Sequence, residues 1–164
     1  MTGHFVRRER LGVFAALFAA VALVCNTSTI ALADASAIEI DGPPEFVQDM
    51  QAALFQLEFI RLRTYVETYV WRIEPSSAAG WPADAAGAVE YPADRFQRAI
   101  VQVRWPMDGL NDPATVAALL AHEATHARLN QVDPDHRGDE TATRSVQLLV
   151  LWELAGPLPA QWQP

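Results

Sequence analysis

The chain has a single cysteine among its 164 residues, and this residue, Cys25, lies in the apolar N-terminal segment. A domain that starts after this segment has no disulfide and no cysteine-ligated metal site, so its core alone must stabilise it. The composition allows such a core, because 51% of the residues are hydrophobic and the length suits one domain.

The chain also lacks the long apolar run of a typical membrane-spanning helix. The run Leu11–Val24 has 14 residues, whereas a spanning helix needs about 20. Three arginines at positions 7 to 10 precede this run and small residues follow it, which is typical of a cleaved export signal. Residues 1–33 or 1–37 are therefore expected to be a signal peptide, since both ends suit the peptidase. The protein should then be exported to a periplasmic or extracellular space.

Three other roles of the N-terminal segment stay open. The apolar stretch could continue to Leu32 and remain as a membrane anchor, although the polar residues 26–29 interrupt it. Arg7 and Arg8 could belong to a twin-arginine signal, which the following residues fit poorly. Cys25 could carry a lipid, but a bulky residue precedes it where lipoprotein signals place a small one.

Basic residues are scarce beyond the N-terminal segment. After residue 33 the chain has 9 basic and 19 acidic residues, which gives a formal net charge of −10. Such a surface repels phosphate backbones and anionic lipid headgroups, so we expect neither nucleic acid nor a membrane surface as a partner. A membrane tether is expected only if the N-terminal segment is not cleaved, and the sequence does not indicate an oligomeric state.

Helical patterns occur in three segments. Apolar residues recur at steps of three and four over residues 46–57, which predicts a first helix that ends near residue 60. Asp112 is suited to cap a second helix over Pro113–Asn130, because proline is favoured at the first helical position. A third helix is expected to begin within residues 133–139 and to end at Gly156.

Strand patterns are fewer. Residues 38–40 form a short extended lead, and the β-branched and aromatic stretch Val66–Ile73 is predicted as a strand, although a helix competes there. Pro75–Asp94 is rich in proline, alanine and glycine and should be a long surface loop. Arg98–Trp105 alternates between apolar and polar residues and is the clearest strand. We therefore predict one α+β domain over residues 34–164, mostly helical with a short sheet.

The motif that carries chemistry is a pair of histidines, His122 and His126, with Glu123 directly after the first. Residues four apart lie on one face of a helix, so both imidazoles can bind one metal ion while Glu123 stands at the rim. The composition would produce this spacing by chance about 0.006 times in a chain of this length. In the alternative interpretation, the two histidines only pack against the core.

A third metal ligand must come from another segment, because a catalytic zinc normally has three protein ligands and one open position. Glu140 is favoured, since the short break between the second and third helices can fold them together. Four neighbouring residues compete with it: Asp133, Asp135, His136 and Asp139. Each of the acids could instead be a helix cap or a solvated charge.

This motif, followed by a downstream glutamate, resembles the gluzincin branch of zinc metallopeptidases over roughly residues 100–154. The resemblance implies a small zincin-like domain in which the motif helix packs against the following helix and below a sheet. It also implies that the edge strand of this sheet, here Arg98–Trp105, holds an extended peptide. The metal ligands that it implies are His122, His126 and Glu140. Glu123 resembles the general base that activates water.

The match departs from the family in two places. The step of 14 residues from His126 to Glu140 is shorter than in large gluzincins, and Arg128 stands where an apolar residue is common. A metzincin is a poorer match, because its third histidine would fall at Val132. The family also has a side chain that stabilises the oxyanion, for which the sequence leaves three candidates: Tyr91, His136 and Arg144.

These observations predict an exported zinc-dependent metallohydrolase that hydrolyses peptide bonds in small or unstructured peptide or protein substrates. Two alternatives remain. The chain could be a non-catalytic exported module that binds metal or a partner, with the loop over residues 75–94 as a contact surface. It could also be an amidase that acts on a non-peptide or cell-wall amide.

Overall fold

The computed structural model describes residues 37–77, 80–82, 85–106 and 112–156. Residues 1–36 of the predicted signal peptide, the expected cleavage site after residue 33 and residues 157–164 lie outside the described residues, whereas the alternative cleavage site after Ala37 falls at their start. Within them, no helix combines the length and the apolar character that crossing a membrane requires.

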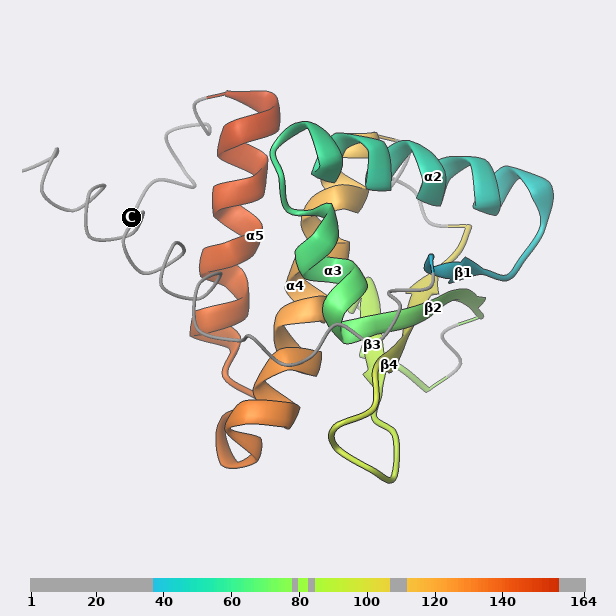
Figure 1. Ribbon diagram of the computed structural model, residues 1–164. Helices are drawn as coiled ribbons and strands as arrows, with labels where there is room; N and C mark the ends of the chain where they lie inside the picture. The colour runs from blue at the N-terminus through green and yellow to red at the C-terminus, as the bar shows by residue number, and fades with distance from the viewer. Residues whose placement is uncertain (1–36, 78–79, 83–84, 107–111, 157–164) are drawn as a thin grey trace, which may run out of the picture. The chain divides into compact units, whose positions relative to one another are not determined.

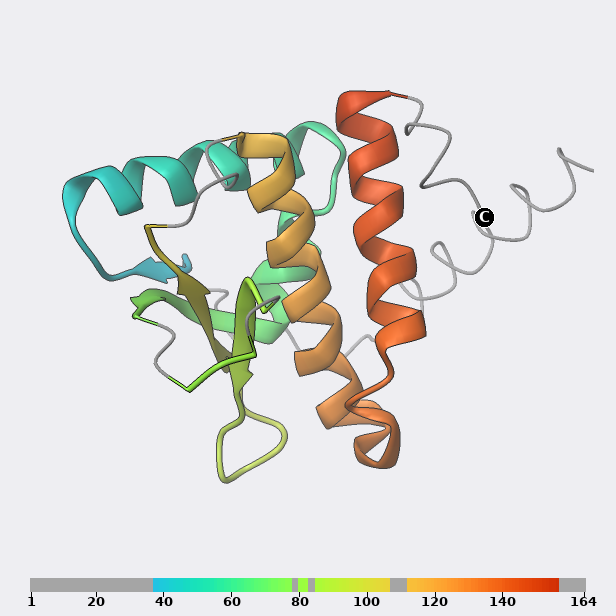
Figure 2. The ribbon, with the colours of Figure 1, turned by 180° about the vertical axis from the view of Figure 1, so that it is seen from behind.

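The described residues form four α-helices, one 3-10 helix and a four-stranded sheet, which confirms the α+β prediction. Their order is β1 (Glu39–Ile40), α2 (Pro44–Phe59), α3 (Arg63–Tyr69), β2 (Val70–Ser76), β3 (Gly87–Glu90), β4 (Ala99–Arg104), α4 (Pro113–Val132), η1 (Pro134–His136) and α5 (Glu140–Ala155). Figures 1 and 2 show α4 between the sheet on one side and α5 on the other. The predicted packing of the second helix against the third is thus present.

The sheet has the strand order β1-β2-β4-β3. Strands β1, β2 and β4 run parallel to one another, and β3 pairs with β4 in the antiparallel sense. Strand β4 is therefore an interior strand, and β3 is the edge. The expectation that Arg98–Trp105 forms the edge strand is wrong, because β3, which the sequence analysis missed, covers it on one side.

The core lies between the sheet, α2 and α4. Its largest fully buried side chains include Phe46, Met50, Leu57, Ile73 and Leu120. The stripe predicted for residues 46–57 is buried as expected, in a helix that ends one residue before position 60. The alternation predicted for β4 is also present, since Ala99, Val101 and Val103 are buried and their neighbours are less so.

Both predicted helix starts have an aspartate cap. Asp112 accepts hydrogen bonds from the backbone amides of Ala114 and Thr115. Asp139 accepts from the amides at the start of α5, so the third helix begins at Glu140, just after the predicted interval. These bonds satisfy amide groups that have no partner inside the helix.

The predicted strand Val66–Ile73 is wrong in its first half, because residues 66–69 belong to α3. Two interactions at helical spacing favour this helix. Arg63 pairs with Glu67 at 2.8 Å, and the rings of Tyr65 and Tyr69 meet edge to face. Local pairs and packing thus override the β-propensity of the aromatic and branched residues.

The predicted loop Pro75–Asp94 is wrong at two places. Pro75 and Ser76 end β2, and residues 87–90 form β3. Strand β3 is short and begins with glycine and alanine, which have low β-propensity, so its sequence gives no strand signal. Its pairing with β4 stabilises the extended conformation, which its residue types alone do not favour.

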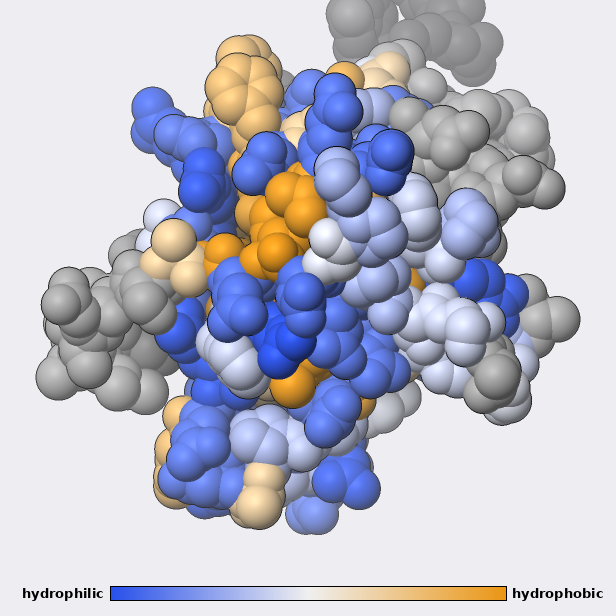
Figure 3. Space-filling view, turned by 90° about the vertical axis from the view of Figure 1, so that its right-hand side faces the viewer, coloured by the Kyte–Doolittle hydropathy of each residue, from blue (hydrophilic) through white to orange (hydrophobic). Residues whose placement is uncertain are grey.

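Five large hydrophobic side chains are exposed in the described residues: Phe55, Phe59, Phe96, Val132 and Trp152. On the face that Figure 3 presents, hydrophobic side chains occupy a small area that hydrophilic ones enclose. Apolar groups of this extent are normal on a folded domain.

Candidate metal centre and active site

Helix α4 brings two imidazoles to one point. His122 and His126 are one turn apart, and their Nε2 atoms are 3.2 Å from each other. Both side chains are largely buried, with exposed fractions of 12% and 10%. The helix that carries them is packed against α2, α3, α5 and the sheet. The pair is therefore held on a well-supported element.

Glu140, at the first position of α5, completes the group. One carboxylate oxygen lies 3.4 Å from the Nε2 atom of His126, and the other lies 3.7 Å from that of His122. Ligand atoms around a tetrahedral zinc are about 3.3–3.4 Å apart, given zinc–nitrogen distances of about 2.0–2.1 Å. The three side chains predicted as ligands thus stand at separations that suit one zinc ion, and together they are the group found among the described residues that could hold a metal, called the metal-binding group below.

The backbone fixes the orientation of one imidazole. The Nδ1 atom of His126 lies 2.7 Å from the carbonyl oxygen of Arg137. A carbonyl only accepts, so Nδ1 donates this hydrogen bond, and Nε2 is the ring nitrogen that faces the other two candidate ligands. Metal-binding histidines commonly have such a second hydrogen bond, which sets their tautomer.

The other imidazole has a different environment. The Nδ1 atom of His122 is buried and has no hydrogen-bond partner at bonding geometry, although the amide of Gln147 is near enough to influence the ring. Burial lowers the pKa of His122, and the neighbouring His126 adds to this effect, while Glu140 and Gln147 oppose it. The neutral form is the one that binds a metal.

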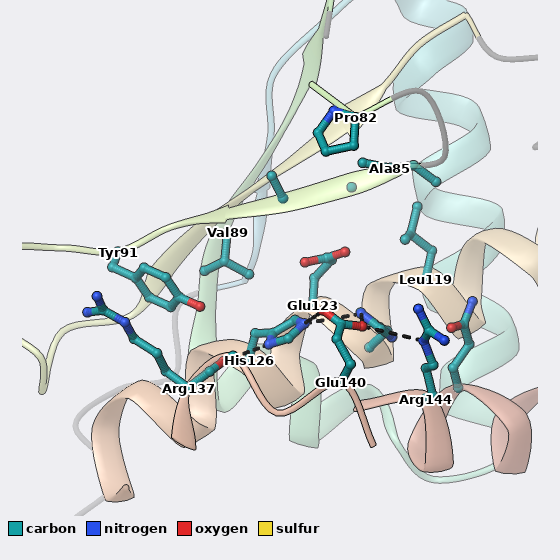
Figure 4. A pocket seen from close by; sticks show the side chains of 16 residues that line it. Pro82, Ala85, Val89, Tyr91, Leu119, Glu123, His126, Arg137, Glu140 and Arg144 are labelled. Carbon is teal, nitrogen blue, oxygen red and sulfur yellow. Dashed lines mark hydrogen bonds and ion pairs between the residues drawn. The ribbon is translucent and has the colours of Figure 1, made fainter. Parts of the chain in front are cut away.

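Glu123 lies beside the three ligands without belonging to them. Its residue is only 5% exposed, and burial, with a smaller contribution from the charge of Glu140, raises its pKa to about 8. A bound cation would act in the opposite direction. Figure 4 shows its carboxylate directed into the pocket, toward β3 and away from Glu140.

The carboxylate of Glu123 lies directly below β3. A Cβ atom added to Gly87 would be 2.7 Å from its Oε1 atom, which is closer than real contacts. Glycine at this position therefore allows the edge strand to approach the carboxylate.

A pocket of about 580 Å³ joins these groups. Its walls come from β3 and the residues beside it, from α4, from Arg137 and Gly138 between η1 and α5, and from α5 (Figure 4). Polar groups are concentrated on the helical side, and small or apolar residues form the strand side. A cavity of this size with a few convergent polar groups is typical of a small-molecule or peptide site.

The competing ligands lie elsewhere. Asp139 caps α5, and Asp133 pairs with the exposed His136 at 3.0 Å. Asp135 is exposed in η1. None of these lines the pocket or joins the metal-binding group among the described residues.

Two of the three oxyanion candidates reach the pocket. Tyr91 and Arg144 line it, whereas His136 does not. Arg144 is mostly exposed, and its Nε atom lies 3.5 Å from Glu140. Burial raises the pKa of Tyr91, the charge of Glu123 adds to this effect, and Arg137 opposes it.

Three contributors to the site were missed in the sequence: Gly87, Arg137 and Gln147. Gln147 had a signal, because Glu140, Arg144 and Gln147 follow one another at steps of four and three on α5. Gly87 and Arg137 had none, because only the tertiary fold brings Gly87 next to Glu123 and the Arg137 carbonyl next to His126.

No protein-family model matches the chain, and no curated protein or solved structure matches it significantly. The resemblance to gluzincins therefore depends on the residues described above and on their arrangement.

Proposed function

We propose that this protein is an exported zinc-dependent metallohydrolase that cleaves peptide bonds, a small relative of the gluzincins. The observation that carries the proposal is the convergence of His122, His126 and Glu140 beside the buried carboxylate of Glu123, at the base of one pocket. Two neutral imidazoles and a carboxylate are a ligand set that suits zinc.

His122, His126 and Glu140 would hold the metal, and three protein ligands is the number that a catalytic zinc normally has. A zinc ion held there would supply Lewis acidity, which lowers the pKa of water and polarises a carbonyl group. A structural zinc site normally has four protein ligands, so three ligands beside a cavity favour a catalytic site over a purely structural one.

Glu123 is the group that would move the proton. Its carboxylate would accept a proton from the attacking water and pass it to the leaving amine. Its burial keeps bulk water away, and the close approach of Gly87 restricts where the carboxylate can point.

Strand β3 is the element that would align the substrate. One of its sides pairs with β4, and it is an edge of the sheet, so its other side can accept an extended peptide. Gly87, Ala88 and Val89 line the pocket, which places this edge next to Glu123.

The proposal is tested by metal content and hydrolysis together. We expect the purified protein to bind one zinc ion, the His126→Ala variant to lose it, and the His136→Ala variant to keep it. The Glu123→Gln variant should keep zinc and lose at least about 100-fold in peptide hydrolysis, the lower bound for losing a general base.

Two results would contradict the proposal. A protein that stays metal-free in the presence of zinc would remove the basis for the site. Undiminished hydrolysis by Glu123→Gln would remove the role of the carboxylate. Fractionation of cells that express the full chain tests export separately.

A further inference from the structure

One end of the pocket has a guanidinium and a phenol in contact. Arg137 lies over the ring of Tyr91 with its Cζ atom 5.5 Å from the ring centre. Both residues line the pocket, and in Figure 4 the Tyr91 hydroxyl is directed toward the space above His126. The pair thus presents several hydrogen-bond donors to the same cavity as the metal-binding group.

Arg137 has no acidic partner among the described residues, since no carboxylate there lies within 4.0 Å of its guanidinium. Arg144, on the other side of the metal-binding group, differs because it pairs with Glu140. The backbone carbonyl of Arg137 is occupied by His126, which holds this residue at the pocket. The side chain of this exposed residue lies against the Tyr91 ring, and no carboxylate among the described residues neutralises it.

A bound divalent cation would give the pocket a charge opposite to that of the domain, because the two arginines and two glutamates that line it cancel one another. With a divalent cation bound, the two arginines and the cation outweigh Glu123 and Glu140 by two charges, while the region after residue 33 has a net charge of −10. At physiological ionic strength, charges separated by more than about 8 Å are largely screened. A small anionic group inside the pocket is therefore attracted despite the acidic surroundings.

We propose that the substrate carries a carboxylate, which Arg137 and the Tyr91 hydroxyl bind beside the scissile bond. This inference rests on the proposed hydrolase function. The planar guanidinium matches a carboxylate through two parallel hydrogen bonds, a geometry that lysine cannot reproduce. The carboxylate can be an acidic side chain or a free C-terminus.

Peptide pairs test the inference and separate these two sources. The first pair compares aspartate and glutamate with asparagine and glutamine next to the cleaved bond, and the second compares free with amidated C-termini. In the zinc-loaded protein we expect kcat/KM to be at least about tenfold higher for the carboxylate member of one pair, as charge-assisted pairing predicts. The pair whose members differ in kcat/KM shows whether the recognised carboxylate is an acidic side chain or a free C-terminus.

Variants assign the preference to Arg137. In the peptide pair that shows a preference, the ratio of kcat/KM between the carboxylate peptide and its neutral counterpart should fall to near one in Arg137→Ala. It should be intermediate in Arg137→Lys. Arg95→Ala is the matched control, because Arg95 also lies over an aromatic ring, that of Phe96, but outside the pocket lining. Its ratio should equal that of the unmodified protein. No preference in either pair, or a preference that survives Arg137→Ala, would overturn the inference.

A binding experiment decides the inference even if no peptide is cleaved, in which case the proposed hydrolase function fails. Succinate and its monoamide both offer one carboxylate to the metal, but only succinate offers a second one to Arg137. Calorimetry on the zinc-loaded protein should show succinate binding at least about tenfold tighter, with the difference lost in Arg137→Ala and kept in Arg95→Ala. Equal binding of the two compounds would refute it.

Discussion

The two helices that build the candidate site differ in how firmly the fold holds them. Helix α4 has 12 buried residues among 20, because the sheet and three helices surround it. Helix α5 has only two, Thr143 and Val150, among 16. The site therefore combines two ligands on an enclosed helix with a third on a peripheral one. A metal ion would join the two elements, so its effect should be greatest on α5.

The carboxylates of Glu123 and Glu140 differ in burial in the same way as the helices that carry them. Glu123 on α4 is buried and has a raised pKa, whereas the side chain of Glu140 on α5 is 55% exposed. Neighbouring carboxyl groups in unlike environments can take separate roles, here one as a proton carrier and the other as a metal ligand. The proposed roles follow this division.

The largest expected effect comes from removing the metal. Zinc at 100 times its dissociation constant should stabilise the fold by about 2.7 kcal/mol. Chelation should therefore lower the melting temperature and increase amide exchange in α5 more than in α4, because α5 has less packing of its own. Thermal denaturation and hydrogen exchange measure the two effects.

A matched pair on α5 tests whether this effect passes through the proposed ligand. Glu140→Ala should abolish the stabilisation by zinc, and Glu153→Ala, at an exposed position of the same helix, should preserve it. Equal responses of the two variants would mean that Glu140 is not a ligand.

A smaller effect is expected at the contact between the strand and α4. Gly87→Ala places a methyl group 2.7 Å from the Glu123 Oε1 atom, so either the strand or the carboxylate must move. Overpacking of this kind typically destabilises by about 1–3 kcal/mol. Hydrolysis should fall while zinc binding remains. Gly138→Ala is the control, since its added Cβ would meet nothing within 4 Å. A fully active Gly87→Ala protein would argue against a fixed carboxylate.

The smallest effect concerns the two helix caps. Asp112→Ala and Asp139→Ala should each destabilise the protein by about 1 kcal/mol, because each removes acceptors for backbone amides. Only Asp139→Ala should also weaken zinc binding, because the cap is adjacent to Glu140. Zinc titration of both variants checks this, and equal affinities would show that α5 is held without its cap.

The sequence predicted the helical part of the site well because helices place residues by local spacing. His122 and His126 were expected on one face, and Asp112 was expected to cap their helix. Glu140 was favoured by its position after a short break, and the structure brings it to the histidines. Its role as a ligand stays a prediction.

The strand side was predicted poorly because strands depend on distant partners. Gly87–Glu90 contains too few β-favouring residues to indicate a strand, and only β4 reveals it. Because β3 was missed, the edge strand that the resemblance implies was assigned to Arg98–Trp105, which is an interior strand. Likewise, His126 donates a hydrogen bond to a backbone carbonyl, and the residue type at that position does not predict such a contact.

The length of β3 limits what the protein can recognise. Four residues in extended conformation span only about 13 Å, at about 3.3 Å for each residue. A chain laid along this strand gains few backbone hydrogen bonds, too few to pull a segment out of a folded protein. For the proposed hydrolase, selectivity would then come from groups close to the reacting bond, and its targets should be segments that are already unfolded or free peptides.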